Sequence, residues 1–339
     1  MKQKIALLGF GTVGQGLCEI LLDKKDYLKE KYNYDFDVVA VADFAYGNAY
    51  NPNGLNITQM IEEAKAKQKF TQDITDMDNI TLIKECNADV LCELTYTDLT
   101  TGGPAIDHCR AAFTSGKSVV TSNKGPAALK YPEFKELADA NGVKFMIEGT
   151  VCAGTPVINL ADGPLAGCEI SKIAGILNGT TNYMLSEMEK GMAYDEVLKI
   201  AQELGYAEAD PTGDVEGHDA RGKVTILANI VMGAKLDISD VSCEGITKIT
   251  PADIEKAKAE NARWKLIGNV EKKADGTVIG SVSPQMVSMT HPLAGIMGAT
   301  NALTFTTDLL GDVTIVGPGA GRIETGYSIL TDLIDIYRK

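Results

Sequence analysis

The chain has 339 residues, 45% of them apolar, which is enough to bury a sizeable core and excludes an intrinsically disordered protein. The excess of 46 acidic over 32 basic residues gives a net charge of −14, which repels phosphate backbones and anionic lipids. We therefore expect two domains that bind small polar ligands, with neither nucleic acid nor a membrane as partner. The seven cysteines lack CxxC pairs and zinc spacing, and the chain shows no signal-peptide or membrane-spanning pattern, so we expect reduced thiols and a cytoplasmic location.

The first part of the chain alternates apolar strands with helical patterns. Residues 4–14 predict a strand that breaks into a glycine turn and continues into a helix, and a second strand ends at Asp43. Strands are also predicted at residues 88–95 and 117–123, with a helix at residues 105–115 between them. Because strands that alternate with helices form parallel sheets, we expect an α/β fold with a Rossmann-type, doubly wound parallel sheet.

After the strand-like residues 143–149 the pattern changes. The elements predicted there are a strand at residues 169–177, helices at 194–205, 217–236 and 251–268, strand-like pieces at 272–282 and 301–307, and a closing helix. Trp264 falls in the third of these helices, and its spacing predicts packing rather than chemistry. These elements predict a second, α+β catalytic domain.

A glycine motif stands between the first strand and the first helix. Gly9, Gly11 and Gly14 form GxGxxG in the context that dinucleotide binding requires. Gly9 allows the tight turn, Gly11 lets the backbone approach a pyrophosphate, and Gly14 permits close helix packing, with the helix N-terminus facing the anion. A merely structural glycine turn is the alternative. The residues expected to contact NAD or NADP here are Gly9, Gly11, Thr12, Val13 and Gly14.

Asp43 ends the second strand, 29 residues after Gly14. The usual spacing is about 20 residues, and we attribute the longer gap to a charged extension of the first helix. Its carboxylate can accept hydrogen bonds from the adenosine ribose hydroxyls, whereas a 2′-phosphate would meet like charge, and residues 44–46 supply no cation. This favours NAD over NADP. A simple turn acid at a strand end is the alternative.

Two polar turns that follow strands are candidates for ligand binding. Residues 121–126, around Lys124, lie at the carboxyl end of the predicted sheet, where ligands bind; a solvated loop lysine is the alternative. Residues 178–182, NGTTN, lead from a strand into a helix, so their backbone N–H groups and hydroxyls could hold a carboxylate. An ordinary N-cap explains the same residues.

The stretch GYAEADPTGDVEGHDARGK, residues 205–223, sets five carboxylates ahead of one lysine. Its spacing does not match a calcium loop. The sequence becomes helical near residue 217, which places Asp219 and Lys223 four residues apart on one helix face. An ammonium beside carboxylates stays protonated and oriented, as proton donation to a carbonyl oxygen requires. An exposed salt bridge is the alternative.

This stretch and the segments GFGTVG, TSNKGPAA, EGTVCAGTP, GILNGTTNYML and GPGAG together resemble the homoserine dehydrogenases over nearly the whole chain. The resemblance implies interconversion of L-homoserine and L-aspartate 4-semialdehyde with NAD(P), in threonine and methionine biosynthesis. It also implies a homodimer of the short form, without a fused aspartate kinase or a regulatory ACT domain. The alternatives are another Rossmann dehydrogenase of a small amino or hydroxy acid and an NAD(P) sensor without turnover. The lysine and its carboxylates argue against a sensor, because a sensor needs no proton donor.

The resemblance also implies roles for individual residues. Lys223 matches the proton donor, and Lys124 matches a second active-site lysine. The residues implied to bind substrate are Glu208, Asp219, Gly179 and Thr180. Further cofactor contacts are implied at Thr95, Lys124, Gly205 and Gly321.

A monovalent cation, expected to be sodium, is implied near Glu148, Val151, Ala153 and Thr155. Carbonyls at positions of equal parity on an extended strand point the same way, and with one carboxylate they would make a site of hard oxygens. The predicted boundaries are a dinucleotide-binding domain at residues 1–146 with 322–339, a dimerisation region at 147–156 and 275–321, and a catalytic domain at 157–274.

Overall fold

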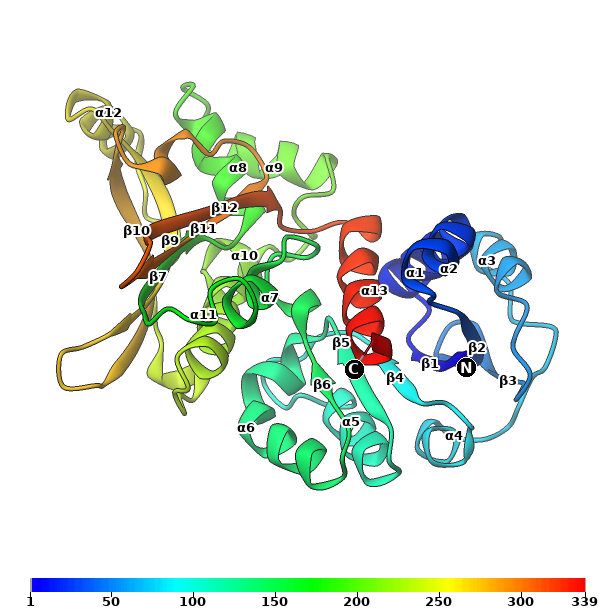
Figure 1. Cartoon of the computed structure of the whole chain (residues 1–339). Helices are drawn as coiled ribbons and strands as arrows, with labels where there is room; N and C mark the ends of the chain where they lie inside the picture. The colour runs from blue at the N-terminus through cyan, green and yellow to red at the C-terminus, as the bar shows by residue number, and fades with distance from the viewer. Residues whose placement is uncertain (1, 339) are drawn as a thin grey trace. The chain divides into compact units, whose positions relative to one another are not determined.

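The computed structural model describes residues 2–338, which divide into two compact units (Figure 1). As far as they are described, Met1–Gly154 and Gly321–Lys339 form the first unit and Thr155–Ala320 form the second. The closing helix therefore belongs to the unit that begins the chain. Among the described residues, no helix combines the length and the apolar character needed to cross a membrane.

The first unit is built on a six-stranded sheet with the order β3-β2-β1-β4-β5-β6. Its strands are β1 (Gln3–Leu8), β2 (Phe36–Asp43), β3 (Gly47–Tyr50), β4 (Val90–Glu93), β5 (Ser118–Thr121) and β6 (Phe145–Met146). Every neighbouring pair is parallel except β2 and β3, which form an antiparallel hairpin. The order confirms the doubly wound sheet and brings the carboxyl ends of β1, β2, β4 and β5 to one edge.

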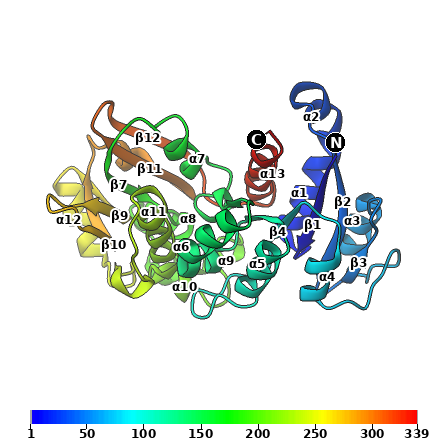
Figure 2. The ribbon, with the colours of Figure 1, turned by 60° about the horizontal axis from the view of Figure 1, so that its bottom comes forward.

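Helices lie on both faces of this sheet. They are α1 (Thr12–Asp23), α2 (Lys25–Tyr32), α3 (Ile57–Lys65), α4 (Asn79–Glu85), α5 (Ala105–Thr114), α6 (Lys124–Ala140) and α13 (Arg322–Arg338), with a 3₁₀ turn η1 (Glu148–Thr150). Helix α1 packs against α3 and α13, whereas α5 packs against α4 and α6, and Figures 1 and 2 show these groups on opposite faces of the sheet. Strands covered on both faces are apolar throughout, which is why the central strands were readable from the sequence.

The second unit contains a mixed six-stranded sheet with the order β12-β11-β7-β9-β10-β8. Its strands are β7 (Ile170–Ile176), β8 (Ser242–Cys243), β9 (Ala262–Lys272), β10 (Val278–Ser288), β11 (Thr300–Thr307) and β12 (Gly311–Pro318). Its helices are α7 (Val157–Asp162), α8 (Gly179–Met188), α9 (Tyr194–Glu203), α10 (Thr212–Val215), α11 (His218–Val231) and α12 (Pro251–Ala259), with 3₁₀ turns η2 (Ile238–Asp240) and η3 (Pro292–Gly295). Helices α8 and α11 both pack on the strand β9. The prediction of a second, α+β domain is confirmed.

The helix predicted at residues 251–268 is wrong in its second half. Helix α12 ends at Ala259, and Asn261 adopts a left-handed conformation with φ 53°, after which the chain continues as β9. Trp264 therefore lies on a strand, where its indole nitrogen donates a hydrogen bond of 2.9 Å to the Asp253 carbonyl of α12. The strand expected at residues 272–282 is interrupted at residues 273–277 by the turn between β9 and β10, which is closed by a bond of 2.7 Å from Lys273 N to Thr277 O, and its second half is the start of β10.

Candidate active site

The glycine motif forms a tight turn between β1 and α1. Gly9 has φ +97°, and a Cβ there would lie 2.5 Å from the carbonyl oxygen of Leu94, so only glycine fits. A Cβ on Gly14 would lie 2.5 Å from Gly9 O, which shows how closely the helix returns to the turn. At Gly11 a Cβ would meet no atom within 4 Å, so the backbone here is open to a ligand. An approaching pyrophosphate would find bare backbone in front of the N-terminus of α1.

Asp43 is tied to this turn. Its Oδ2 accepts a hydrogen bond of 2.7 Å from Phe10 N, and its Oδ1 accepts from Ala45 N at 2.7 Å and Tyr46 N at 3.2 Å. The carboxylate thus links the end of β2 to the glycine turn and fixes its own position. Each carboxylate oxygen can accept more than one hydrogen bond, so these contacts are compatible with ribose binding as well as with the turn-acid alternative.

The loops after β4 and β5 are joined by side chains. Asn123 Nδ2 donates to the carbonyls of Tyr96 at 2.9 Å and Thr95 at 3.2 Å, and its Oδ1 accepts from Gly125 N at 2.9 Å, which caps α6. Thr95 Oγ1 also donates to the buried carboxylate of Glu93. Lys124 is the first residue of α6 and so stands directly at this edge of the sheet.

A polar cluster in the second unit forms where α8 begins. Asn178 caps the helix by accepting a hydrogen bond of 2.9 Å from Thr181 N, as the N-cap alternative predicts. Its Nδ2 meanwhile donates to Asp214 Oδ1 at 2.6 Å and to Asp219 Oδ2 at 3.1 Å. The same side chain therefore caps α8 and ties it to the acidic stretch.

Lys223 lies in this cluster, one helical turn beyond Asp219 on α11. Its Nζ donates to Asp219 Oδ2 at 2.7 Å and to the Leu177 carbonyl at 2.7 Å. The lysine side chain is only 9% exposed and that of Asp219 is 21% exposed. This burial distinguishes the pair from an exposed salt bridge, so the surface alternative is wrong.

Asp214 is a member of the cluster that sequence reasoning counted among the acidic residues but did not assign. Burial raises the pKa of its carboxyl, the hydrogen bond from Asn178 opposes this, and the neighbouring Asp219 raises the pKa further. Two carboxylates that share the Asn178 amide favour a bound cation, such as the ammonium of an amino acid. Spacing could not reveal this, because Asn178 and Asp214 are 36 residues apart in the chain.

The other residues expected to bind substrate or cofactor are divided between the two units. Thr180 Oγ1 donates to the Tyr206 carbonyl at 2.6 Å, which joins α8 to the segment after α9. Gly205 in that segment has φ +75°. Glu208 is exposed, and within the described residues its carboxylate has no hydrogen bond to the cluster; its backbone carbonyl accepts from Gln202 Nε2 at 3.0 Å. Gly321, with φ +141°, stands immediately before α13 in the first unit.

The expected cation segment is not an extended strand. Glu148, 2% exposed, begins the 3₁₀ turn η1, and Cys152 and Ala153 have positive φ values of 58° and 50°. The argument from carbonyls of equal parity is therefore wrong, because it requires extended backbone. Val151 and Ala153 belong to the first unit with Glu148, whereas Thr155 is the first residue of the second unit.

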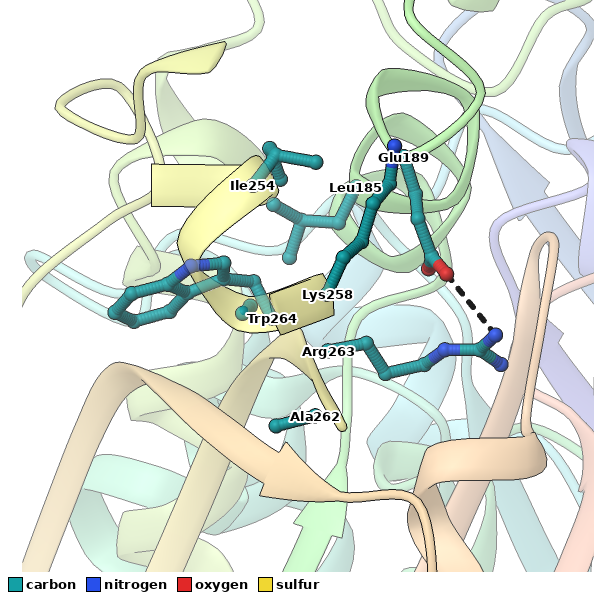
Figure 3. Close-up of a pocket in the computed structure, with 8 residues that line it drawn as sticks. Leu185, Glu189, Ile254, Lys258, Ala262, Arg263 and Trp264 are labelled. Atoms are coloured by element: carbon teal, nitrogen blue, oxygen red, sulfur yellow. Dashed lines mark hydrogen bonds and ion pairs between the residues drawn. The ribbon is translucent and has the colours of Figure 1, made fainter. Parts of the chain in front are cut away.

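A small pocket elsewhere in the second unit is unrelated to the cluster. It holds about 180 Å³ of space, partly open to solvent, between α8, α12 and the start of β9. Figure 3 shows Arg263 reaching from β9 to Glu189, a salt bridge of 3.0 Å, at its edge. None of its lining residues belongs to the predicted site.

A doubly wound sheet with an open glycine turn in the first unit, and a buried lysine held by the Asp219 carboxylate in the second, define the class of the protein. It is an NAD(P)-dependent oxidoreductase. Residues 9–148 match the profile described as "Homoserine dehydrogenase, NAD binding domain", and residues 156–334 match that described as "Homoserine dehydrogenase". The chain belongs to the homoserine dehydrogenase family, as the sequence motifs predicted.

Similar proteins support the same assignment. A protein of Pseudomonas canavaninivorans called "NAD(+)-dependent homoserine dehydrogenase" is 47% identical, over 99% of this chain and 96% of its own. A crystal structure of a putative homoserine dehydrogenase from Archaeoglobus fulgidus has a TM-score of 0.89 and 40% identity, with 99% of each chain covered. A mutant hyperthermophilic archaeal homoserine dehydrogenase in complex with NADPH has a TM-score of 0.86 and 30% identity, over 100% of this chain and 98% of its own.

Proposed function

We propose that Lys223 is the acid–base group in the oxidation of L-homoserine to L-aspartate 4-semialdehyde. The observation that carries this is the buried Lys223 ammonium, held at 2.7 Å by both Asp219 and the Leu177 carbonyl. These bonds orient Nζ at the start of α8, where a substrate oxygen would bind. NAD(P), held at the glycine turn of Gly9, Gly11 and Gly14, would supply the hydride acceptor for the oxidation and the hydride donor for the reverse reaction. In the oxidative direction Lys223, as the neutral amine, accepts the hydroxyl proton, and in the reverse direction its ammonium donates that proton to the carbonyl oxygen.

The carboxylates around Lys223 fit an amino-acid substrate. Asp214 and Asp219 offer negative charge to the ammonium of homoserine, and Glu208 lies on the same acidic stretch. Gly179 and Thr180 begin α8, so their N–H groups are available at a helix N-terminus for the substrate carboxylate. We also propose Lys124 as a second active-site lysine, and Thr95, Lys124, Gly205 and Gly321 as cofactor contacts.

The test of this function is turnover. Purified protein should oxidise L-homoserine with NAD or NADP, seen as a rise in absorbance at about 340 nm, and reduce aspartate semialdehyde in reverse. Serine and threonine, which differ from homoserine in chain length or branching, serve as comparison substrates. Equal turnover of either would assign the site to a different small amino acid, and no absorbance change with any of the three would overturn the proposal.

We also propose that NAD is the preferred cofactor, and expect kcat/KM for NAD to exceed that for NADP. Asp43 would accept the two ribose hydroxyls but repel a 2′-phosphate, and the turn after it holds no cation. The relative from P. canavaninivorans carries NAD(+) in its name, although an archaeal relative binds NADPH. Asp43→Asn should lower the ratio of kcat/KM for NAD to kcat/KM for NADP. Asp37→Asn, an exchange on the same strand, should leave that ratio unchanged. An NADP preference of about tenfold, or about 1.4 kcal/mol, would contradict this role.

Three further features of the family are proposed for this chain. A monovalent cation, expected to be sodium because only one carboxylate is involved, would bind through Glu148 and the carbonyls of neighbouring residues, including Val151, Ala153 and Thr155. The chain would act as a homodimer, as its resemblance to the family implies. The three-part division with a dimerisation region at 147–156 and 275–321 remains a prediction.

A further inference from the structure

A buried lysine outside the site has no place in the chemistry described so far. Lys265 on β9 is 1% exposed. Its Nζ donates to Asn182 Oδ1 at 2.8 Å and to the Ile296 carbonyl, and lies 3.7 Å from Met297 Sδ. Burial, with the charge of Arg263 adding to it, lowers the pKa of Lys265 to about 8. Within the described residues all its hydrogen-bond partners are neutral.

An ammonium that is buried with only neutral hydrogen-bond acceptors lowers the stability of the fold. A buried charge without an ionic partner costs free energy, and an apolar side chain of similar length would avoid that cost. The lysine instead orients two neighbouring groups, because it donates to one acceptor on α8 and to another in the segment before β11. Such a group acts on the geometry of its neighbours.

The immediate effect falls on Asn182. With Oδ1 turned to Lys265, its Nδ2 must face the other way, where it donates to the carbonyls of Ile296 at 3.2 Å, Gly298 at 2.8 Å and Thr300 at 3.2 Å. Ser186, one turn along α8, accepts from Gly298 N at 3.3 Å. Lys265 and Asn182 thereby clamp residues 296–300 onto α8.

Residues 296–300 are in close contact with the start of α8. A Cβ on Gly179 would lie 2.6 Å from Ala299 O, so the segment lies against the first residue of α8 with no space between them. Gly179 follows the N-cap Asn178, whose amide bonds to Asp214 and Asp219. A continuous series of contacts inside the second unit therefore runs from Lys265 to the carboxylate cluster.

We propose that Lys265 is a positioning residue for the substrate site, acting through Asn182 and residues 296–300 on the N-terminal turn of α8. It does not touch substrate. It fixes where Asn178, Gly179 and Thr180 stand relative to Asp214 and Asp219. The proposal rests on the function proposed above, in which this turn binds homoserine.

Lys265→Met tests the proposal, because a positioning role predicts a change in KM for homoserine with little change in kcat. The variant should raise KM for homoserine about tenfold, change kcat less than about threefold and leave KM for NAD unchanged, because only the substrate turn is displaced. Asn182→Ala should raise KM similarly, and the double variant should be no worse than either single one, because both act through one contact series. Lys272→Met, an exposed lysine on the same strand, is the matched control and should match the parent protein.

The outcomes separate this proposal from the function itself. If the parent protein turns over homoserine but folded Lys265→Met keeps its KM, the positioning role is overturned and the proposed function stands. Lys265→Gln, which keeps a hydrogen-bond donor, provides a second variant and should show a smaller rise in KM. If neither variant folds, Lys265 serves stability alone and the proposal is likewise overturned. Additive effects of the Lys265 and Asn182 exchanges would overturn the shared route.

Discussion

Lys223→Ala is expected to lower kcat for homoserine oxidation by about 10²-fold or more, with KM for NAD nearly unchanged. A positioned acid–base group contributes typically 10²–10⁴-fold, and the loss falls on the chemical step. Two hydrogen bonds, to Asp219 and to the Leu177 carbonyl, fix Nζ in this place, and alanine has no group that could take over its role. Stopped-flow or steady-state absorbance with saturating substrate measures the effect.

Two controls distinguish catalysis from loss of structure. Lys248 forms an i,i+4 pair with Glu244 at 3.3 Å, but its side chain is 81% exposed, so Lys248→Ala should be silent. Small primary amines added to Lys223→Ala should restore part of kcat if the missing group is an acid–base amine. Near-normal turnover in Lys223→Ala would remove the lysine from the mechanism, and a fall in folded fraction without amine rescue would assign it to stability.

The dinucleotide-binding unit could be predicted well because its signals are local. The glycines that must be glycine stand within six residues of one another, and the strands are apolar throughout because both faces are covered. Only part of the role of Asn178 could be predicted from neighbouring residues in the sequence. Its role as an N-cap was readable, but its bonds to Asp214 and Asp219 span 36 and 41 residues and depend on how α8 meets α11.

Lys265 was hidden by a wrong element assignment. The charged run before it has helical spacing, so residues 251–268 predict one helix. Asn261 in the left-handed conformation ends that pattern, and asparagine is among the residues that tolerate this conformation best. The tryptophan, leucine and isoleucine that follow it were the available sign of a strand. The extended backbone predicted for the cation segment was wrong for a related reason, because no local signal predicts positive φ at Cys152 and Ala153.

Gly9→Ala should destabilise the first unit by about 3 kcal/mol, whereas Gly11→Ala should change its stability by less than about 0.5 kcal/mol. At Gly9 an alanine would hold φ +97° and would also place its Cβ 2.5 Å from Leu94 O, a backbone atom that cannot turn away. At Gly11 the Cβ would meet no protein atom within 4 Å. Denaturant unfolding of the two variants beside the parent protein measures the difference.

The same pair of exchanges tests the binding role of the turn. Because the space beyond Gly11 is where a pyrophosphate would approach, Gly11→Ala should weaken NAD binding about tenfold, or about 1.4 kcal/mol, in a protein that remains fully folded. Fluorescence titration with NADH measures the affinity. Unchanged affinity in Gly11→Ala would show that the cofactor does not lie over this glycine, and a stable Gly9→Ala would show that the turn can move away from Leu94.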